Sequence, residues 1–159
     1  MKYLQSIKIF ILCFLLLSIM SCDQKKNEFI SLDHMTFINS YYKDSVKISY
    51  YVLIDHPDPT DKILKKEIIQ YVKKKLQNNT SLKEKNTASL NFVFYKKTDN
   101  TSYFITHKEN SGGLLSEEIS HYQEDYIANY YVSKCDGGAT EKIYLYSQPE
   151  EILANSCKK

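Results

Sequence analysis

An alternating segment followed directly by a helical one constrains the fold more than any other feature of this chain. Between positions 46 and 54 apolar side chains recur at every second residue, and these are Val46, Ile48, Tyr50, Val52 and Ile54. A period of two is the pattern of a β-strand with one buried face. The sequence therefore predicts a strand over 46–54 that contributes one side to a hydrophobic core.

The next segment predicts one long amphipathic helix. Asp58 is a suitable N-cap, Pro59 suits the first helical position, and Asp61 places an acidic residue near the start. Apolar residues then recur every four positions, at Leu64, Ile68, Val72 and Leu76. This spacing gathers them on one face of a helix that we expect to end near Gln77.

The rest of the chain predicts further strands, expected over 90–95, 102–106, 126–132 and 142–146. Asp136-Gly137-Gly138 favours positive φ and therefore a hairpin between the last two strands. The chain from Pro149 onward is expected to be a short helix or an extended tail, and 29–43 shows no clear period. We predict an α+β domain in which a mainly antiparallel sheet of about five strands packs on one long amphipathic helix.

The first 21 residues have the three-part organisation of an export signal. Lys2 and Lys8 form a basic start, and Ile9–Met20 is an apolar run of about 12 residues. A membrane-spanning helix needs about 20 apolar residues. This shorter run, flanked by charged residues, therefore predicts a cleavable signal peptide.

The end of this segment, Ile19-Met20-Ser21-Cys22, resembles the lipobox of bacterial lipoproteins. That family has an aliphatic residue three positions before the cysteine and a small residue directly before it, as Ile19 and Ser21 provide. The resemblance implies cleavage before Cys22, acylation of this cysteine with palmitate-like chains, and a membrane anchor in the bacterial cell envelope. It leaves the choice of membrane and face open. The alternative is an ordinary secretory signal followed by a chance cysteine.

Two other segments, Tyr50–Pro57 and His121–Ala128, are similar to motifs of a loose group of small Bacteroidetes lipoproteins. That group has a "YYVLI–N/D–x–P" strand before a helix and an "hxxDxIA" stretch before a final hairpin. The group implies no particular activity. We divide the chain into a signal peptide over 1–21, a tether and N-terminal segment over 22–43 that begins with the lipidated cysteine, and a single α+β domain over 44–159.

Composition argues against a dedicated nucleic-acid binder. All 21 basic residues are lysines, so the bidentate arginine contacts that read phosphates and bases are absent. Residues 1–21 contain two of these lysines and none of the 19 acidic residues, so the mature chain would be neutral. The 14 tyrosines, all but Tyr3 outside the signal, serve either as sheet packing or as a binding surface.

One segment offers candidate ligands for a metal or an enzymatic site. Glu117, His121 and Asp125 would share one face of a continuous helix. Carboxylates and imidazole bind metals, yet two such helical steps span about 12 Å, too far for one ion. HExxH, GxSxG, Walker and GxGxxG motifs are all absent from the sequence. We therefore expect a charged solvent face here and no metal or cofactor.

Two cysteines would remain once Cys13 leaves with the signal and Cys22 is acylated. Cys135 opens the hairpin turn and Cys157 lies in the C-terminal tail. An exported compartment permits disulfides, and an even pair is what a bridge requires. The sequence predicts a Cys135–Cys157 disulfide, with two unpaired thiols as the alternative.

These patterns together predict a lipid-anchored cell-envelope protein with a non-enzymatic binding, accessory or immunity-type role. Its expected partners are the membrane, through Cys22, and a protein or glycan. The alternative is a small envelope enzyme or metal-binding protein that uses the region of Glu117, His121 and Asp125.

Overall fold

Strand β3 (Val46–Asp55) forms where the alternating segment predicts a strand, and it organises one side of the sheet. β1 (Glu28–Ser31) pairs antiparallel with the second half of β3, and β2 (Phe37–Ser40) pairs antiparallel with its first half. β4 (Thr87–Lys96) pairs parallel along the other edge of β3. The computed structural model describes residues 27–40, 44–78, 86–109, 112–114, 116–146 and 148–158.

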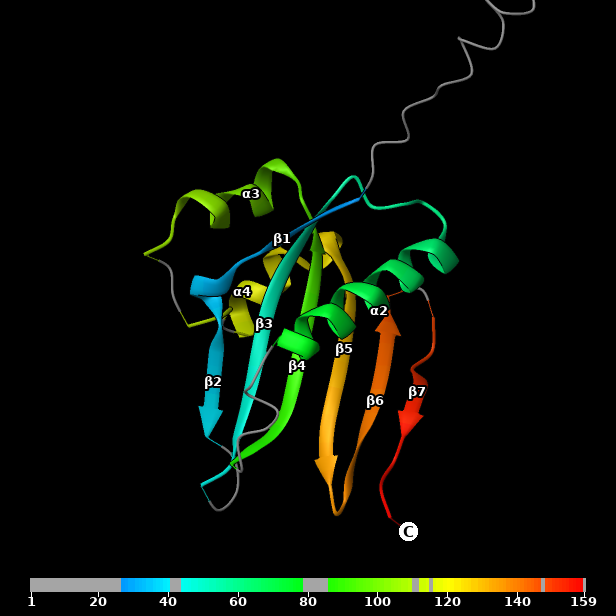
Figure 1. The fold of residues 1–159 in the computed structure, drawn as a ribbon. Helices are drawn as coiled ribbons and strands as arrows, with labels where there is room; N and C mark the ends of the chain where they lie inside the picture. The colour runs from blue at the N-terminus through cyan, green and yellow to red at the C-terminus, as the bar shows by residue number, and fades with distance from the viewer. Residues whose placement is uncertain are drawn as a thin grey trace, which may run out of the picture.

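The remaining strands extend the sheet beyond β4. β5 (Tyr126–Cys135), β6 (Gly138–Leu145) and β7 (Glu151–Asn155) follow in sequence, each antiparallel to its neighbour. The sheet has seven strands in the order β1-β3-β4-β5-β6-β7, with β2 also paired to β3 (Figure 1). The predicted β5–β6 hairpin is confirmed, and Gly137 in its turn has φ of +73°. The class is therefore α+β with a mainly antiparallel sheet, as predicted.

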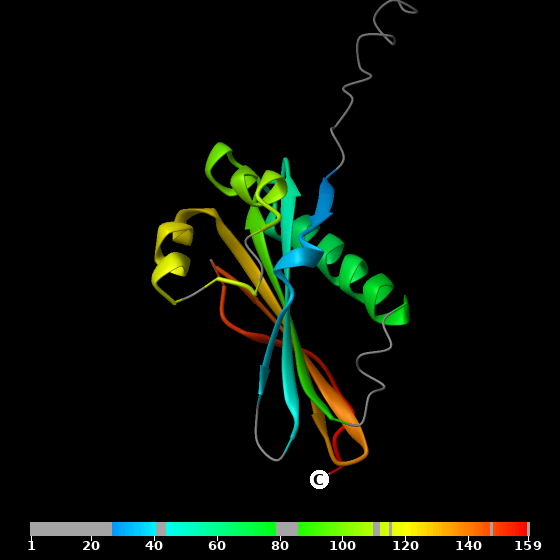
Figure 2. The ribbon, with the colours of Figure 1, turned by 90° about the vertical axis from the view of Figure 1, so that its left-hand side faces the viewer.

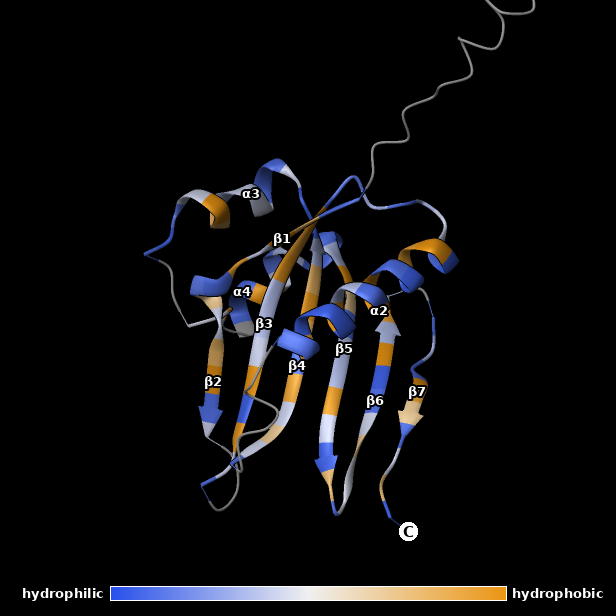
Figure 3. Cartoon of the chain, viewed as in Figure 1, coloured by the Kyte–Doolittle hydropathy of each residue, from blue (hydrophilic) through white to orange (hydrophobic). Residues whose placement is uncertain are grey.

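Helix α2 (Asp61–Asn78) connects the parallel strands β3 and β4 and crosses one face of the sheet (Figures 1 and 2). A parallel pair requires such a crossover. Its buried side chains are Leu64, Ile68 and Val72, which share a core with the alternating residues of β3. Its outer face is mostly hydrophilic (Figure 3). The helix begins later than predicted, because the Thr60 carbonyl accepts its first backbone hydrogen bonds and Asp58 instead caps the Thr60 amide.

A second hydrophobic cluster lies on the sheet face opposite α2. It is covered by η1 (Asp33–Met35), α3 (Asp99–Thr106), α4 (Ser116–His121) and η3 (Gln123–Asp125) (Figure 2). The buried members of this cluster are Leu32, Met35, Tyr51, Leu53, Val93, Tyr95 and Phe104. The expectation that β3 buries only one face was therefore wrong for its second half.

The strand predicted over 102–106 is also wrong, because this segment is helical. Thr98 and Thr101 form a capping box, in which each side chain accepts a hydrogen bond from the other's backbone amide. This local start signal outweighs the strand preference of Tyr103 and Phe104. The number of strands differs as well, since 28–31, 37–40 and 151–155 form strands that the sequence did not predict.

The sheet begins at Glu28, inside the segment 22–43 that was assigned to the tether and N-terminal region. The predicted signal and the lipobox with Cys22 lie outside the described residues. Within the part of the chain that the structure covers, no helix is long and apolar enough to span a membrane.

Candidate functional site

A pocket of about 570 Å³ opens on the sheet face opposite α2. Its floor is formed by strands β3 to β6, and one wall is formed by α4 and η3. We call it the tyrosine pocket. Its lining residues are Tyr51, Asn91, Val93, Tyr95, Ile119, Ser120, Gln123, Tyr126, Asn129, Tyr144 and Tyr146.

The period of the strands places these side chains together. In β4 the even-numbered residues Leu90, Phe92 and Phe94 enter the core under α2, so the odd-numbered residues point to the pocket. The register then sets Val93 beside Asn129 of β5, and Asn129 beside Tyr144 of β6. Three neighbouring strands therefore present amide and aromatic side chains in adjacent rows.

Two amide side chains in this floor are only partly satisfied. The Asn129 Nδ2 donates a hydrogen bond of 2.7 Å to the Tyr131 hydroxyl. The Oδ1 atoms of Asn91 and Asn129 are buried and find no hydrogen-bond partner among the described residues. A buried acceptor without a partner costs about 1–3 kcal/mol. The pocket therefore holds two acceptors that a bound donor would satisfy.

Two tyrosines of the pocket, Tyr95 and Tyr126, have raised pKa values. Burial, with a contribution from Tyr51, raises the pKa of Tyr95 to about 12. Burial also raises the pKa of Tyr126, and the neighbouring phenols of Tyr131, Tyr144 and Tyr95 add to this effect. The Tyr126 ring lies 5.8 Å from the Tyr95 ring and 6.3 Å from that of Tyr146 between centroids. The pocket thus combines aromatic faces with neutral hydroxyl groups.

The structure does not bring Glu117, His121 and Asp125 together. α4 ends at His121, and Asp125 lies in the separate turn η3, so the continuous helix that would align them does not form. Glu117 and His121 are exposed, and Asp125 accepts a hydrogen bond of 3.0 Å from Thr98 Oγ1. Across the described ranges no group of three or more His, Cys, Asp or Glu side chains is arranged to hold a metal. The same segment instead supplies Ile119, Ser120 and Gln123 to the tyrosine pocket.

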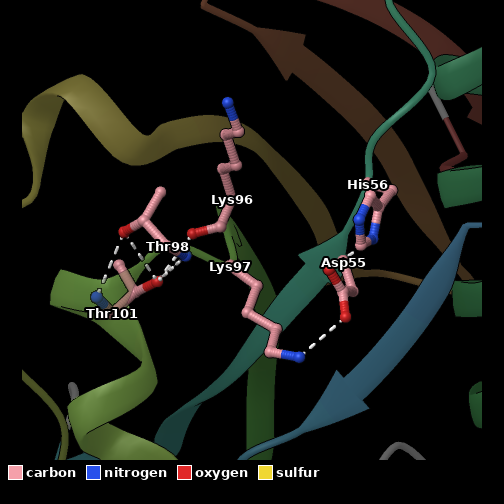
Figure 4. A network of polar contacts seen from close by, with 6 residues as sticks. All are labelled: Asp55, His56, Lys96, Lys97, Thr98 and Thr101. Atoms are coloured by element: carbon pink, nitrogen blue, oxygen red, sulfur yellow. Dashed lines mark hydrogen bonds and ion pairs between the residues drawn. The ribbon is translucent and has the colours of Figure 1, made fainter.

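A polar network joins the ends of the parallel strands β3 and β4 (Figure 4). Asp55 lies between Lys97 Nζ at 2.7 Å and His56 Nδ1 at 2.6 Å. The hydrogen bond to Asp55 raises the pKa of Lys97. His56 has φ of +52°, as expected for a residue in the turn that leaves the strand. These side chains do not line the tyrosine pocket. Their contacts hold the ends of β3 and β4 together.

The two cysteines of the predicted bridge lie side by side. Cys135 ends β5 and Cys157 follows β7, and their Cα atoms are 5.6 Å apart, a separation that a disulfide spans. Ser156 reinforces this approach, since its amide and hydroxyl both donate hydrogen bonds to the Ala139 carbonyl. The bridge would join the C-terminal tail to the tip of the hairpin.

We expect replacement of Cys135 and Cys157 by serine in one variant to lower the free energy of unfolding by about 3 kcal/mol, because the bridge restricts the unfolded chain over a loop of about 22 residues. Urea unfolding of oxidised wild type and variant measures the difference. Alkylation of the unreduced chain should label neither cysteine, and labelling appears once a reductant is added. Labelling of both thiols without reductant would show that the bridge does not form.

The tyrosine pocket was not predicted, although its sequence signal is present. Asn91 and Asn129 each interrupt a strongly apolar or aromatic strand, in Leu90-Asn91-Phe92 and Ala128-Asn129-Tyr130. A polar amide in the middle of such a strand must find a partner or face a cavity. The sequence alone does not reveal the register that places these two strands side by side.

Comparison of the chain with protein-family models, with curated proteins and with solved structures gives no significant match.

Proposed function

We propose that this chain is a lipid-anchored protein of the bacterial cell envelope that acts by binding, in an accessory or immunity-type role, and not by catalysis. The observation that carries the binding role is the chemistry of the tyrosine pocket. None of the described residues that line it is charged at neutral pH, and its groups are phenols, amides, one hydroxyl and apolar side chains. Such a lining is typical of ligand sites.

General acid–base catalysis at neutral pH requires a group whose pKa lies near 7. Burial raises the pKa values of Tyr95 and Tyr126, away from that range. This chemistry favours recognition over proton transfer. The lipobox Ile19-Met20-Ser21-Cys22 supports the anchor, since acylation of Cys22 would hold the domain at a membrane.

We further propose that α2, the long amphipathic helix of the described residues, braces the sheet. Leu64, Ile68 and Val72 support this role, because each is at most 7% exposed and packs in the core under the sheet. With α2 on one face, the tyrosine pocket on the opposite face is the surface that we propose a partner contacts.

Site-specific photo-cross-linking in intact cells tests the binding role. A photoreactive phenylalanine derivative is placed at Ser120, which lines the tyrosine pocket and is exposed, in the full-length chain. A matched variant carries the same group at Gln70, an exposed position on α2. We expect a discrete cross-linked product from position 120 and none from position 70. Equal cross-linking, or none, at the two positions would contradict a binding role for this face.

The enzymatic or metal-binding alternative has its own readout. If the protein used the region of Glu117, His121 and Asp125, the purified full-length chain would retain about one metal ion per molecule by elemental analysis. That content would fall in a His121→Ala variant. We expect neither result, since Asp125 is engaged by Thr98 and His121 is exposed to solvent.

A further inference from the structure

We infer that the tyrosine pocket binds a neutral carbohydrate, with a sugar ring against its tyrosines and sugar hydroxyl groups bonded to Asn91 and Asn129. The inference rests on the proposed binding function and specifies the ligand class for the same pocket. It is carried by three features of the lining, which are aromatic faces, unsatisfied acceptors and the absence of charge.

The aromatic faces provide the first feature. Tyr144 and Tyr146 are 37% and 62% exposed, and Tyr126 lies between them and the buried Tyr95. An aromatic ring carries negative charge on its face, which attracts polarised C–H groups. A sugar ring presents such C–H groups on one face and hydroxyl groups around its rim. The exposed tyrosines at the mouth are therefore suited to stack against a sugar.

The unsatisfied amides provide the second feature. The Oδ1 atoms of Asn91 and Asn129 are buried acceptors without a partner among the described residues, and both belong to the pocket lining. Because buried polar groups are normally hydrogen-bonded, these two atoms lack a donor, and a ligand could supply one once the amide groups turn toward the pocket that their residues line. A sugar hydroxyl donates and also accepts, so it can bond to an amide oxygen and to the protonated phenols nearby.

The absence of charge provides the third feature. The described residues of the lining include no Lys, Asp, Glu or His, so a phosphate, a carboxylate or an ammonium group would lose its hydration without finding a counter-charge among them. This argues against nucleotides, uronic acids and amino acids as ligands. The volume of about 570 Å³ lies within the range of known small-molecule sites. A short segment of a neutral glycan matches both the size and the chemistry.

Isothermal titration of the full-length chain in detergent tests this inference. The neutral probes are the tetrasaccharides of maltose, cellulose and mannan and of N-acetylglucosamine, and the charged comparison ligands are tetragalacturonate and adenosine monophosphate. We expect at least one neutral tetrasaccharide to bind, with an affinity that changes less than twofold between low and high salt, because no ion pair forms. Tetragalacturonate and adenosine monophosphate should not bind, because their charged groups would find no counter-charge in the lining.

Matched variants separate recognition from folding. We expect Tyr146→Ala and Asn91→Leu each to weaken binding of that tetrasaccharide about tenfold or more. Asn91→Leu should leave the unfolding midpoint unchanged or raised, because it removes a buried acceptor that has no partner, and a merely structural residue would not behave in this way. Tyr103→Ala, at a 43% exposed tyrosine on α3 outside the pocket, is the control and should bind as wild type does.

Three results would overturn the inference: no binding of any neutral tetrasaccharide, binding of tetragalacturonate or adenosine monophosphate, or unchanged affinity in both Tyr146→Ala and Asn91→Leu. These results are distinguishable from failure of the proposed function. If position 120 still cross-links to a partner while no tetrasaccharide binds, the inferred ligand class is wrong and the proposed binding role of this face is retained.

Discussion

Replacement of Cys22 by alanine is expected to abolish acyl labelling of the chain and to leave the full-length precursor uncleaved. The reason is chemical, since only the thiol at position 22 offers the nucleophile for lipid transfer in the Ile19-Met20-Ser21-Cys22 motif. Without acyl chains the domain also loses the several hydrocarbon tails that stable anchoring needs. Metabolic labelling with an alkyne analogue of palmitate, followed by gel mobility and membrane fractionation, measures all three effects.

Cys13→Ala is the matched control, because Cys13 lies in the apolar run of the same segment but outside the motif. This variant should be labelled and processed like the wild type. If the Cys22→Ala chain still matures to the same size and remains in the membrane fraction, the lipoprotein assignment is wrong.

The second large effect is expected in the core. Ile68→Ala should lower the free energy of unfolding by about 2–5 kcal/mol, as is typical for truncating a fully buried isoleucine. Ile68 is 0% exposed and lies in α2 against the sheet, so its removal leaves a cavity that the packed strands cannot fill. Urea unfolding followed by circular dichroism gives the midpoint and the slope from which the difference is obtained.

The same substitution at Ile63 supplies the control. Ile63 belongs to α2 as well, yet it is 46% exposed. Ile63→Ala should change the free energy of unfolding by less than about 1 kcal/mol, because alanine has the higher helix propensity and little buried surface is lost. Equal destabilisation by the two substitutions would show that α2 does not pack through the face that contains Ile68.

Local periodicity accounts for the part of the fold that was predictable. The alternation of β3, with Ile48, Val52 and Ile54 in the core, is visible in the sequence. The spacing of apolar residues within the strand is enough to predict which side chains share its buried face. The β5–β6 hairpin is visible for the same reason, since Asp136 and Gly137 provide a turn between two apolar runs. Both patterns can be recognised without knowledge of the tertiary structure.

The rest depended on contacts that are distant in sequence. The segment 102–106 carries strand-forming residues, but the Thr98–Thr101 capping box makes it a helix, and Phe104 is then buried in the second cluster. Whether Tyr51 and Leu53 face solvent or protein depends on η1 and α3 covering that face. The tyrosine pocket needs the register between β4, β5 and β6, which no local pattern specifies.

The break between β1 and β2 has a consequence for the outer edge of the sheet. Residues 32–36 stand opposite only Tyr50 and Tyr51 of β3, so the outer strand is divided into two pieces of four residues. An incoming chain would meet two short ladders with no continuous register between them, and such interruptions protect proteins against intermolecular strand addition. Copies held close together on a membrane, as we propose for this chain, would be exposed to that hazard. The divided edge therefore favours solubility of neighbouring copies over fibre-like association.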